Sequence, residues 1–194
     1  MKSTKKIILA SASPRRKALL EQIGLEFKVD TSVREDTEFA GREPHQRARE
    51  SSRKKAESVA ARYPDAIIIA ADTFGVIDGV IIGKPHSESD AREILALLSG
   101  KSHAVITGFT VLDTLTGKAV SRSVETTVFM KRLTTSVIEA YVQTGEPLDK
   151  AGSYAIQGLG AVLVEEIEGD YFNVMGLPLS ALAEVLKEFY VNVL

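Results

Sequence analysis

Apolar runs alternate with amphipathic stretches along the chain, and this alternation predicts an α/β protein. Short runs rich in Ile, Val and Leu that end at polar residues or glycine predict buried strands, whereas apolar residues three or four positions apart predict helices. The predicted strands cover residues 7–9, 26–30, 66–71, 104–130 (with a turn at 116–117) and 161–167, and the predicted helices cover 14–23, 44–63, 87–99, 135–144 and 178–188.

A hairpin is predicted at residues 76–81, where Asp78-Gly79 separates two apolar pairs. Hairpins need antiparallel neighbours, whereas strands joined through a helix usually lie parallel. The sequence therefore predicts a mixed sheet. With 194 residues and an apolar fraction of 44%, the chain is large enough for one domain with two lobes around a cleft.

The segment 9–17, which reads LASASPRRK, joins a predicted strand to a predicted helix. Ser13 suits the N-cap of that helix, and Pro14 suits its first position. A helix N-terminus offers unpaired backbone N–H groups and a partial positive charge, and here two Ser hydroxyls and three cationic side chains surround it. These groups suit a phosphate. They equally suit a plain helix cap with a solvated basic face, so the segment alone leaves both interpretations open.

The composition excludes several classes of function. The chain has no Cys, which excludes disulfides, zinc–thiolate sites, iron–sulfur clusters and a cysteine nucleophile. A net charge of −2 and an aromatic content of 6% argue against a stable complex with nucleic acid. No apolar run approaches the roughly 18 residues of a membrane span, and the run after the basic N-terminus is too short for a signal peptide. We therefore expect a soluble cytoplasmic protein.

Asp72 is a candidate for chemistry because it directly follows the predicted strand 66–71. In open α/β sheets the carboxyl ends of strands face the ligand crevice, and a carboxylate there can bind a divalent cation or activate a water molecule. A turn or a helix cap would also place an aspartate here. Lys84 follows the predicted hairpin, either as a phosphate-binding lysine or as an ordinary turn lysine. Its Gly83-Lys84-Pro85 step lacks the spacing and the hydroxyl residue of a P-loop.

Other candidates lie in polar segments. Glu35 and Asp36 belong to an acidic loop and Lys55 to a charged helix, where solvated side chains are the ordinary explanation. Gln157 lies in the turn-rich segment 145–158. A side-chain amide both donates and accepts, so it can pair with the edge of a nucleobase. A glutamine that binds loop backbone is the alternative.

Taken together, short motifs spread along nearly the whole chain resemble the Maf family of nucleoside triphosphate pyrophosphatases. Each motif alone is weak, but their number and order are specific. The motifs are LASASPRR at 9–16, KA at 55–56, ADT at 71–73, GKP at 83–85, LSG at 98–100, TGEP at 144–147, DKAG at 149–152, IQG at 156–158, GDY at 169–171 and GLP at 176–178.

The resemblance implies a Maf/ITPase-like α/β fold in one domain over residues 1–194, with a mixed sheet and a central active-site cleft between two lobes. It implies hydrolysis of a nucleoside triphosphate to the monophosphate and pyrophosphate with a divalent metal cation, Mg or Mn. An Asp-Thr pair such as Asp72-Thr73 and a glutamine such as Gln157 mark the branch of the family that acts on dTTP and UTP. Modified pyrimidine nucleotides and control of cell division at septum formation are also implied by the family.

The same resemblance assigns roles to acidic residues. Asp72 would be the general base and would hold the metal ion together with Glu35. Glu35 aligns best with the acidic active-site residue of the family, although Asp36 would take its place after a shift of one residue. One position departs from the family pattern, because Phe74 follows Thr73 where a small aliphatic residue is usual.

The remaining assignments concern charge and substrate. Lys55 and Lys84 would offset the charge of the phosphates and assist catalysis. The substrate-binding residues, which hold phosphate groups or select the base, would be Ser11, Arg15, Arg16, Thr73 and Gln157.

Two other functions stay open from the sequence. A nucleotide- or nucleic-acid-binding regulator of cell division without turnover would use the same basic helix start. A phosphomonoesterase would release inorganic phosphate instead of pyrophosphate. We expect a nucleoside triphosphate as the ligand, no membrane and no stable nucleic-acid partner, and a homodimer is left open.

Overall fold

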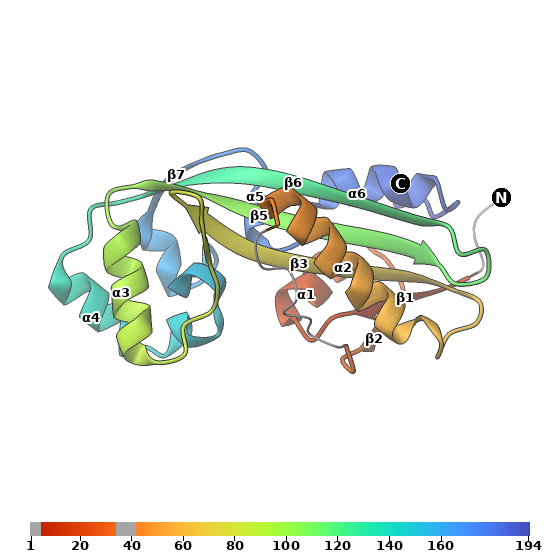
Figure 1. Ribbon diagram of the computed structural model, residues 1–194, viewed down its shortest axis with the longest axis horizontal. Helices are drawn as coiled ribbons and strands as arrows, with labels where there is room; N and C mark the ends of the chain where they lie inside the picture. The colour runs from red at the N-terminus through yellow and green to blue at the C-terminus, as the bar shows by residue number, and fades with distance from the viewer. Residues whose placement is uncertain (1–4, 34–41) are drawn as a thin grey trace. The chain divides into compact units, whose positions relative to one another are not determined.

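A mixed sheet forms the framework of the protein in the computed structural model, which describes residues 5–33 and 42–194 (Figure 1). Its seven strands lie in the order β2-β1-β3-β5-β6-β7, and β4 pairs with β3 outside this path. The strands are β1 Lys6–Ala10, β2 Lys28–Asp30, β3 Ala66–Ile77, β4 Val80–Ile82, β5 Ser102–Asp113, β6 Ala119–Met130 and β7 Val164–Glu168. The fold is α/β with a mixed sheet, as predicted.

The remaining elements are helical. The α-helices are α1 Pro14–Gln22, α2 Pro44–Ala60, α3 Glu88–Leu98, α4 Thr135–Val142, α5 Tyr171–Met175 and α6 Leu179–Lys187. The short 3₁₀ helices are η1 Glu146–Asp149, η2 Ala151–Ser153 and η3 Leu159–Leu163. Over the described part of the chain, no helix is both long enough and apolar enough to cross a membrane.

The chain divides into two compact units. Unit 1 contains residues 1–72, 107–124 and 176–194, and unit 2 contains residues 73–106 and 125–175. Strands β3, β5 and β6 each contribute residues to both units. This division agrees with the two predicted lobes, whereas the cleft stays a prediction.

The core of unit 1 forms around β1, which lies between β2 and β3 and runs parallel to both. Ile8 and Leu9 point to opposite faces and both are fully buried, which explains why this strand lacks the alternation of a half-exposed one. Helix α2 covers the face that carries Ile8 and Ala10 (Figure 1). Ala56 and Val59 of α2 are buried in the same cluster, so packing of α2 sets the position of its polar neighbours.

The core of unit 2 forms where α3 and α4 pack together. Leu95 and Leu98 of α3 and Val142 of α4 are buried in one apolar cluster. At its edge, Nε and Nη2 of Arg92 donate to the two carboxylate oxygens of Glu139 at 2.7 and 2.9 Å. This bidentate pair joins α3 to α4 at the surface.

The β3–β4 hairpin turns at Asp78-Gly79, as predicted. The φ angles are +50° for Asp78 and +77° for Gly79, which are the left-handed values that a two-residue hairpin turn requires. Ile77 pairs with Val80 across the turn.

Several element boundaries differ from the sequence prediction. The strand predicted at 66–71 continues to Ile77, so Asp72 lies inside β3. Residues 161–163, predicted as the start of a strand, belong to η3, and β2 and α2 are shorter than predicted. Helix α5 has no counterpart in the prediction because its five residues are too few to show a helical period.

Candidate active site

Lys55 and Asp72 form an ion pair within unit 1. Lys55 belongs to α2 and Asp72 to β3, and Nζ of the lysine lies 2.7 Å from Oδ1 of the aspartate. The Lys55 side chain is 8% exposed and that of Asp72 is 22% exposed. A buried ammonium group needs a partner, so the contact holds the carboxylate in one direction while part of it stays open to solvent.

Asp72 occupies a position inside the strand, which corrects the expectation that it follows the strand end. Side chains alternate between the two faces of a strand, so Asp72 shares the face of Ala70 and Ile68, on which α2 packs. Thr73 is half-buried and projects from the opposite face. A carboxylate is tolerated at this position because Lys55 reaches it from α2.

The start of α1 agrees with its prediction. Ser13 is the N-cap, because its Oγ accepts a hydrogen bond from the backbone N–H of Arg16, and Pro14 begins the helix. Ser11 is buried, and its Oγ accepts from the N–H of Ser13 and from Nη1 of Arg16, both at 3.2 Å. With two bonds accepted, the hydroxyl proton of Ser11 is the group that it can donate to a phosphate oxygen.

Arg16 has a second contact, with a residue near the C-terminal part of the chain. Its Nε donates to the backbone oxygen of Gly176 at 2.8 Å. Together with the contact to Ser11, this bond fixes the plane of the guanidinium group. A lysine ammonium group cannot make both contacts at once. Arg15, on the same first turn of α1, is half-buried.

Within unit 2, the backbone next to Lys84 contacts the start of the loop that later carries Gln157. The carbonyl oxygen of Gly83 accepts from the N–H of Gly152 at 3.0 Å. Lys84 follows Gly83 directly, and Gln157 lies further along the loop that begins near Gly152. The side chains of Lys84 and Gln157 are both exposed. The hydrogen bond thus places the residue before Lys84 beside η2, which precedes Gln157 along the chain.

Glu146 accepts three hydrogen bonds at the loop that contains the predicted glutamine. Its Oε1 accepts from the Tyr141 hydroxyl and from the N–H of Gly160, both at 2.8 Å, and its Oε2 accepts from the N–H of Leu159 at 3.0 Å. The sequence alone assigns no role to Glu146 or Tyr141. The TGEP motif, which includes Glu146, is the one sequence signal at this position.

Two tyrosines secure the other side of the same loop. The N–H of Ala155 donates to the Tyr141 hydroxyl at 3.2 Å. The Tyr154 hydroxyl lies 2.8 Å from Nε2 of His103, and both residues are buried. Burial lowers the pKa of His103 to about 4, so this imidazole is neutral at physiological pH.

The predicted metal ligands are only partly described. Glu35 and its alternative Asp36 lie outside the described residues. Within residues 5–33 and 42–194, no three acidic or histidine side chains gather as a metal cage. Mg²⁺ is commonly bound through one or two carboxylates together with water and substrate phosphates. The described donor, Asp72, fits that kind of coordination.

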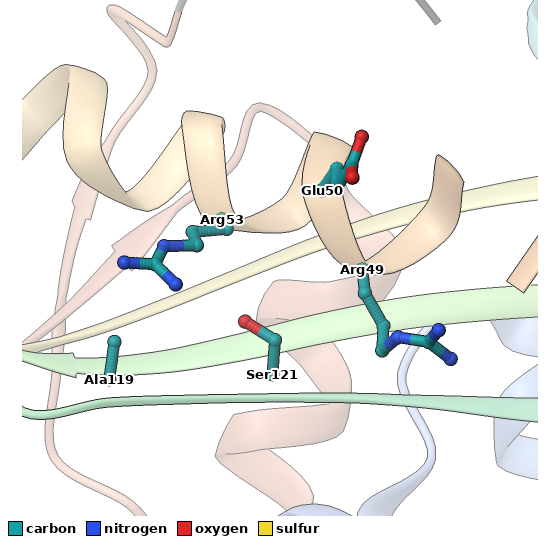
Figure 2. Close-up of a pocket in the computed structure, with 5 residues that line it drawn as sticks. All are labelled: Arg49, Glu50, Arg53, Ala119 and Ser121. Carbon is teal, nitrogen blue, oxygen red and sulfur yellow. The ribbon is translucent and has the colours of Figure 1, made fainter. Parts of the chain in front are cut away.

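A cavity of about 300 Å³ beside α2 in unit 1 involves none of the predicted residues (Figure 2). Figure 2 shows Arg49 and Arg53 reaching from α2 toward the strands, whereas Glu50 points away. Both arginines already have partners, since Arg49 donates to Oγ of Ser123 at 2.9 Å and Arg53 to Oε1 of Glu57 at 2.8 Å. The cavity is lined by Arg49, Glu50, Arg53, Ala119 and Ser121.

Comparison with known proteins finds a family model, relatives in sequence and a solved structure. A family model described as Maf-like protein matches residues 6–189. A dTTP/UTP pyrophosphatase from Methanococcoides burtonii is 50% identical over 190 residues, which are 97% of each chain. Proteins of the same name from Methanosarcina barkeri and Alkaliphilus metalliredigens are 48% and 50% identical, over 97% of this chain and 96% and 99% of theirs. The solved structure of the Staphylococcus aureus Ham1 protein covers 65% of this chain and 72% of its own, with 14% identity and a TM-score of 0.47.

Proposed function

The chain belongs to the Maf family, and from this premise we propose that it hydrolyses dTTP and UTP to the nucleoside monophosphate and pyrophosphate. The Lys55–Asp72 pair carries the proposal, because it holds a partly exposed carboxylate in a fixed direction, as a general base requires. The name shared by the relatives described above supports the same activity.

In the proposed reaction, Asp72 accepts a proton from a water molecule while the water oxygen attacks the α-phosphorus. A bond forms between that oxygen and phosphorus, and the bond to the bridging oxygen breaks, so pyrophosphate leaves with the electron pair. Lys55 keeps the carboxylate directed through its 2.7 Å contact. Arg16 and Lys84 offset the negative charge that develops on the leaving group.

The phosphate-binding part of the proposal rests on the start of α1. The buried Ser11 can donate its hydroxyl proton, and the helix N-terminus contributes backbone N–H groups and a partial positive charge. Arg16 contacts the same hydroxyl oxygen and brings a permanent cation to this position. These groups together suit a phosphate oxygen.

Base selection is assigned to Arg15, Thr73 and Gln157. Uracil and thymine present an N3–H group between two carbonyl oxygens. The amide of Gln157 can accept from N3–H and donate to O4. A rotated amide would present the reverse pattern, which suits cytosine. The direction of this amide therefore decides between the pyrimidines.

A divalent cation, Mg²⁺ or Mn²⁺, belongs to the proposal. Asp72 and Glu35 would hold it, and when bound it would neutralise charge on the phosphate oxygens. A role in septum formation, a cytoplasmic location and a homodimer remain predictions from the sequence.

A nucleotide panel with identified products tests the activity. The protein is incubated with MgCl₂ and dTTP, UTP, CTP or a methylated GTP, and pyrophosphate and inorganic phosphate are measured separately. We expect pyrophosphate from dTTP and UTP. Inorganic phosphate as the product would indicate a phosphatase that removes the terminal phosphate, and nucleotide binding without any product would indicate a regulator without turnover.

A substitution tests the general base. Asp72→Asn is expected to lower kcat for dTTP by about 100-fold or more, because the amide cannot accept the proton. Asp78→Asn makes the same chemical change at an exposed hairpin position and should leave the rate unchanged. Hydrolysis of dTTP by Asp72→Asn at the parental rate would show that another group is the base.

A further inference from the structure

We propose that Tyr141 and Glu146 are positioning residues that fix the backbone on both sides of Gln157 and thereby set the place from which its amide reaches the base. The inference rests on the proposed function, in which Gln157 reads the pyrimidine base. It assigns a specificity role to two residues that do not touch the substrate in that proposal.

The two residues hold the loop at both flanks of Gln157. On the N-terminal side, the Tyr141 hydroxyl accepts from the N–H of Ala155 at 3.2 Å. On the C-terminal side, Glu146 Oε2 accepts from the N–H of Leu159 at 3.0 Å. Tyr141 and Glu146 are themselves joined by a 2.8 Å hydrogen bond. One hydrogen-bonded pair of side chains therefore holds the backbone on both sides of Gln157.

The protons of this network have determined positions. The N–H groups of Leu159 and Gly160 donate to Glu146, which accepts throughout. Tyr141 therefore donates its one proton to Glu146, and its oxygen is left to accept from Ala155. Burial opposes ionisation of Glu146, but the N–H groups of Gly160 and Leu159 and the Tyr141 hydroxyl outweigh it and lower the pKa of the carboxyl. The network is therefore complete at neutral pH.

The loop passes so close to the pair that two of its positions exclude a side chain. A Cβ atom at Gly158 would lie 2.7 Å from Oε2 of Glu146, and a Cβ atom at Gly160 would lie 2.5 Å from the Tyr141 hydroxyl oxygen. Gly158 also has a φ of +107°. The backbone directly after Gln157 is thus shaped by contact with Glu146 and Tyr141.

Tyr141 is buried, whereas Gln157 is exposed. Tyr141 belongs to α4, is 6% exposed and packs in the buried apolar cluster of unit 2. Holding the backbone on both sides of an exposed side chain fixes the point from which that side chain extends. Loss of the support would let the Gln157 amide move away from the place at which it pairs with uracil.

Glu146→Gln tests the inference with almost no change in volume. The variant replaces one acceptor oxygen with an NH₂ group that meets a backbone N–H, so one hydrogen bond is lost. We expect the ratio of kcat/KM for UTP to that for CTP to fall about tenfold, the effect of one hydrogen bond. Glu165→Gln makes the same change at an exposed position of β7 and should leave the ratio unchanged.

Tyr141→Phe is the second variant, because it keeps the buried ring and removes only the hydroxyl. It should lower the same ratio, whereas Tyr171→Phe on α5 should not. If Tyr141→Phe remains folded and the UTP-to-CTP ratio stays at the parental value, the positioning role is wrong.

A double variant shows whether Glu146 acts through Gln157. Gln157→Ala alone removes the base-reading amide and lowers the UTP-to-CTP ratio. Adding Glu146→Gln should then lower the ratio no further, because the residue that it positions is gone. Losses that add together in the double variant would overturn the inference.

Amide hydrogen exchange separates this inference from the proposed function, because it needs no substrate. In Glu146→Gln the amides of Leu159 and Gly160 should exchange at least about tenfold faster than in the parent and in Glu165→Gln. Unchanged exchange would overturn the inference whatever the substrate. A parent protein that does not hydrolyse dTTP would overturn the proposed function, and the exchange rates would still show whether Glu146 holds the loop.

Discussion

Nε of Arg16 donates to the backbone oxygen of Gly176 at 2.8 Å, although 160 positions separate the two residues. The bond joins the first turn of α1 to the segment between α5 and α6, and both belong to unit 1. Nη1 of the same guanidinium group contacts Ser11 at 3.2 Å. Arg16 therefore contributes to the stability of the fold and to the proposed phosphate site at once.

Arg16→Lys is expected to affect both properties. An ammonium group cannot make the two contacts of the guanidinium plane, so the free energy of unfolding should fall by about 1–3 kcal/mol and kcat/KM for dTTP should fall with it. Urea unfolding and initial rates measure the two effects. Arg53→Lys, at an exposed i,i+4 pair with Glu57, should change stability by less than about 0.5 kcal/mol. Equal losses of stability in both variants would contradict this role of Arg16.

His103 is expected to make the protein sensitive to mild acid. Burial lowers its pKa to about 4, from an ordinary value of 6.5. The unfolded chain therefore takes up a proton as the pH falls below 6.5, whereas the folded protein does not until about pH 4. The stability is complete above pH 6.5 and falls by up to about 3 kcal/mol across this window.

Urea unfolding at a series of pH values from neutral to 4 measures this dependence. His103→Gln should remove most of it, and His86→Gln, at an exposed position, should retain it. An unchanged slope in His103→Gln would show that another group is responsible.

Asp30 is expected to stabilise unit 1 down to strongly acidic pH. Hydrogen bonds from Ser32 outweigh the effect of burial and, with those from Arg62 and Tyr63, lower the pKa of Asp30 to about 2. Because the folded value lies below the unfolded one, the contribution is complete above pH 3.8 and is lost as the pH falls through about 2. Asp30→Asn should cost about 2 kcal/mol at neutral pH.

The pH dependence of that variant is the measurement that checks the cause. The difference in unfolding free energy between Asp30→Asn and the parent should shrink as the pH approaches 2. A difference that is constant from neutral pH to pH 2 would mean that packing, and not the charge of Asp30, is responsible.

Removal of divalent cations is expected to stop turnover without unfolding the protein. The part of the chain that the structure describes has no cluster of three acidic or histidine side chains that could hold a structural metal. EDTA should abolish pyrophosphate release, Mg²⁺ should restore it, and Tm should change by less than about 2 °C. A large fall in Tm on addition of EDTA would instead reveal a structural metal.

Elements whose ends are set by particular residue types close in the sequence could be predicted from the sequence. Ser13 and Pro14 set the start of α1 through a cap and a fixed φ, and Asp78-Gly79 sets the hairpin through left-handed backbone angles. Such signals act within a few residues, so they are visible without knowledge of the tertiary structure.

The extent of β3 could not be predicted in this way. Asp72 and Thr73 interrupt an apolar run, and a polar interruption ordinarily ends a buried strand. The strand continues because Lys55, 17 positions earlier, provides the partner that the carboxylate needs. The identity of Asp72 as a candidate was thus accessible from the sequence, while its place within the strand depended on a contact between distant elements.

The hydrogen bonds that hold the backbone around Gln157 could not be predicted from the sequence for the same reason. The TGEP motif marks Glu146 without showing what it binds, and no motif marks Tyr141. The contacts of Glu146 form only when the chain returns past it at Leu159 and Gly160. Long-range contacts of this kind decide where a candidate residue points.

Because β3 continues without a break through Asp72 and Thr73, an insertion or deletion in this part of the strand would disturb both residues. The proposed base and a proposed specificity residue occupy consecutive positions of one strand, so their opposite directions depend on its pleat. Losing or gaining a single residue between Ala70 and Asp72 would exchange the two directions and remove both groups from their places. A change in the length of this stretch therefore affects both groups at once, whereas a substitution at Asp72 or Thr73 changes only one of them.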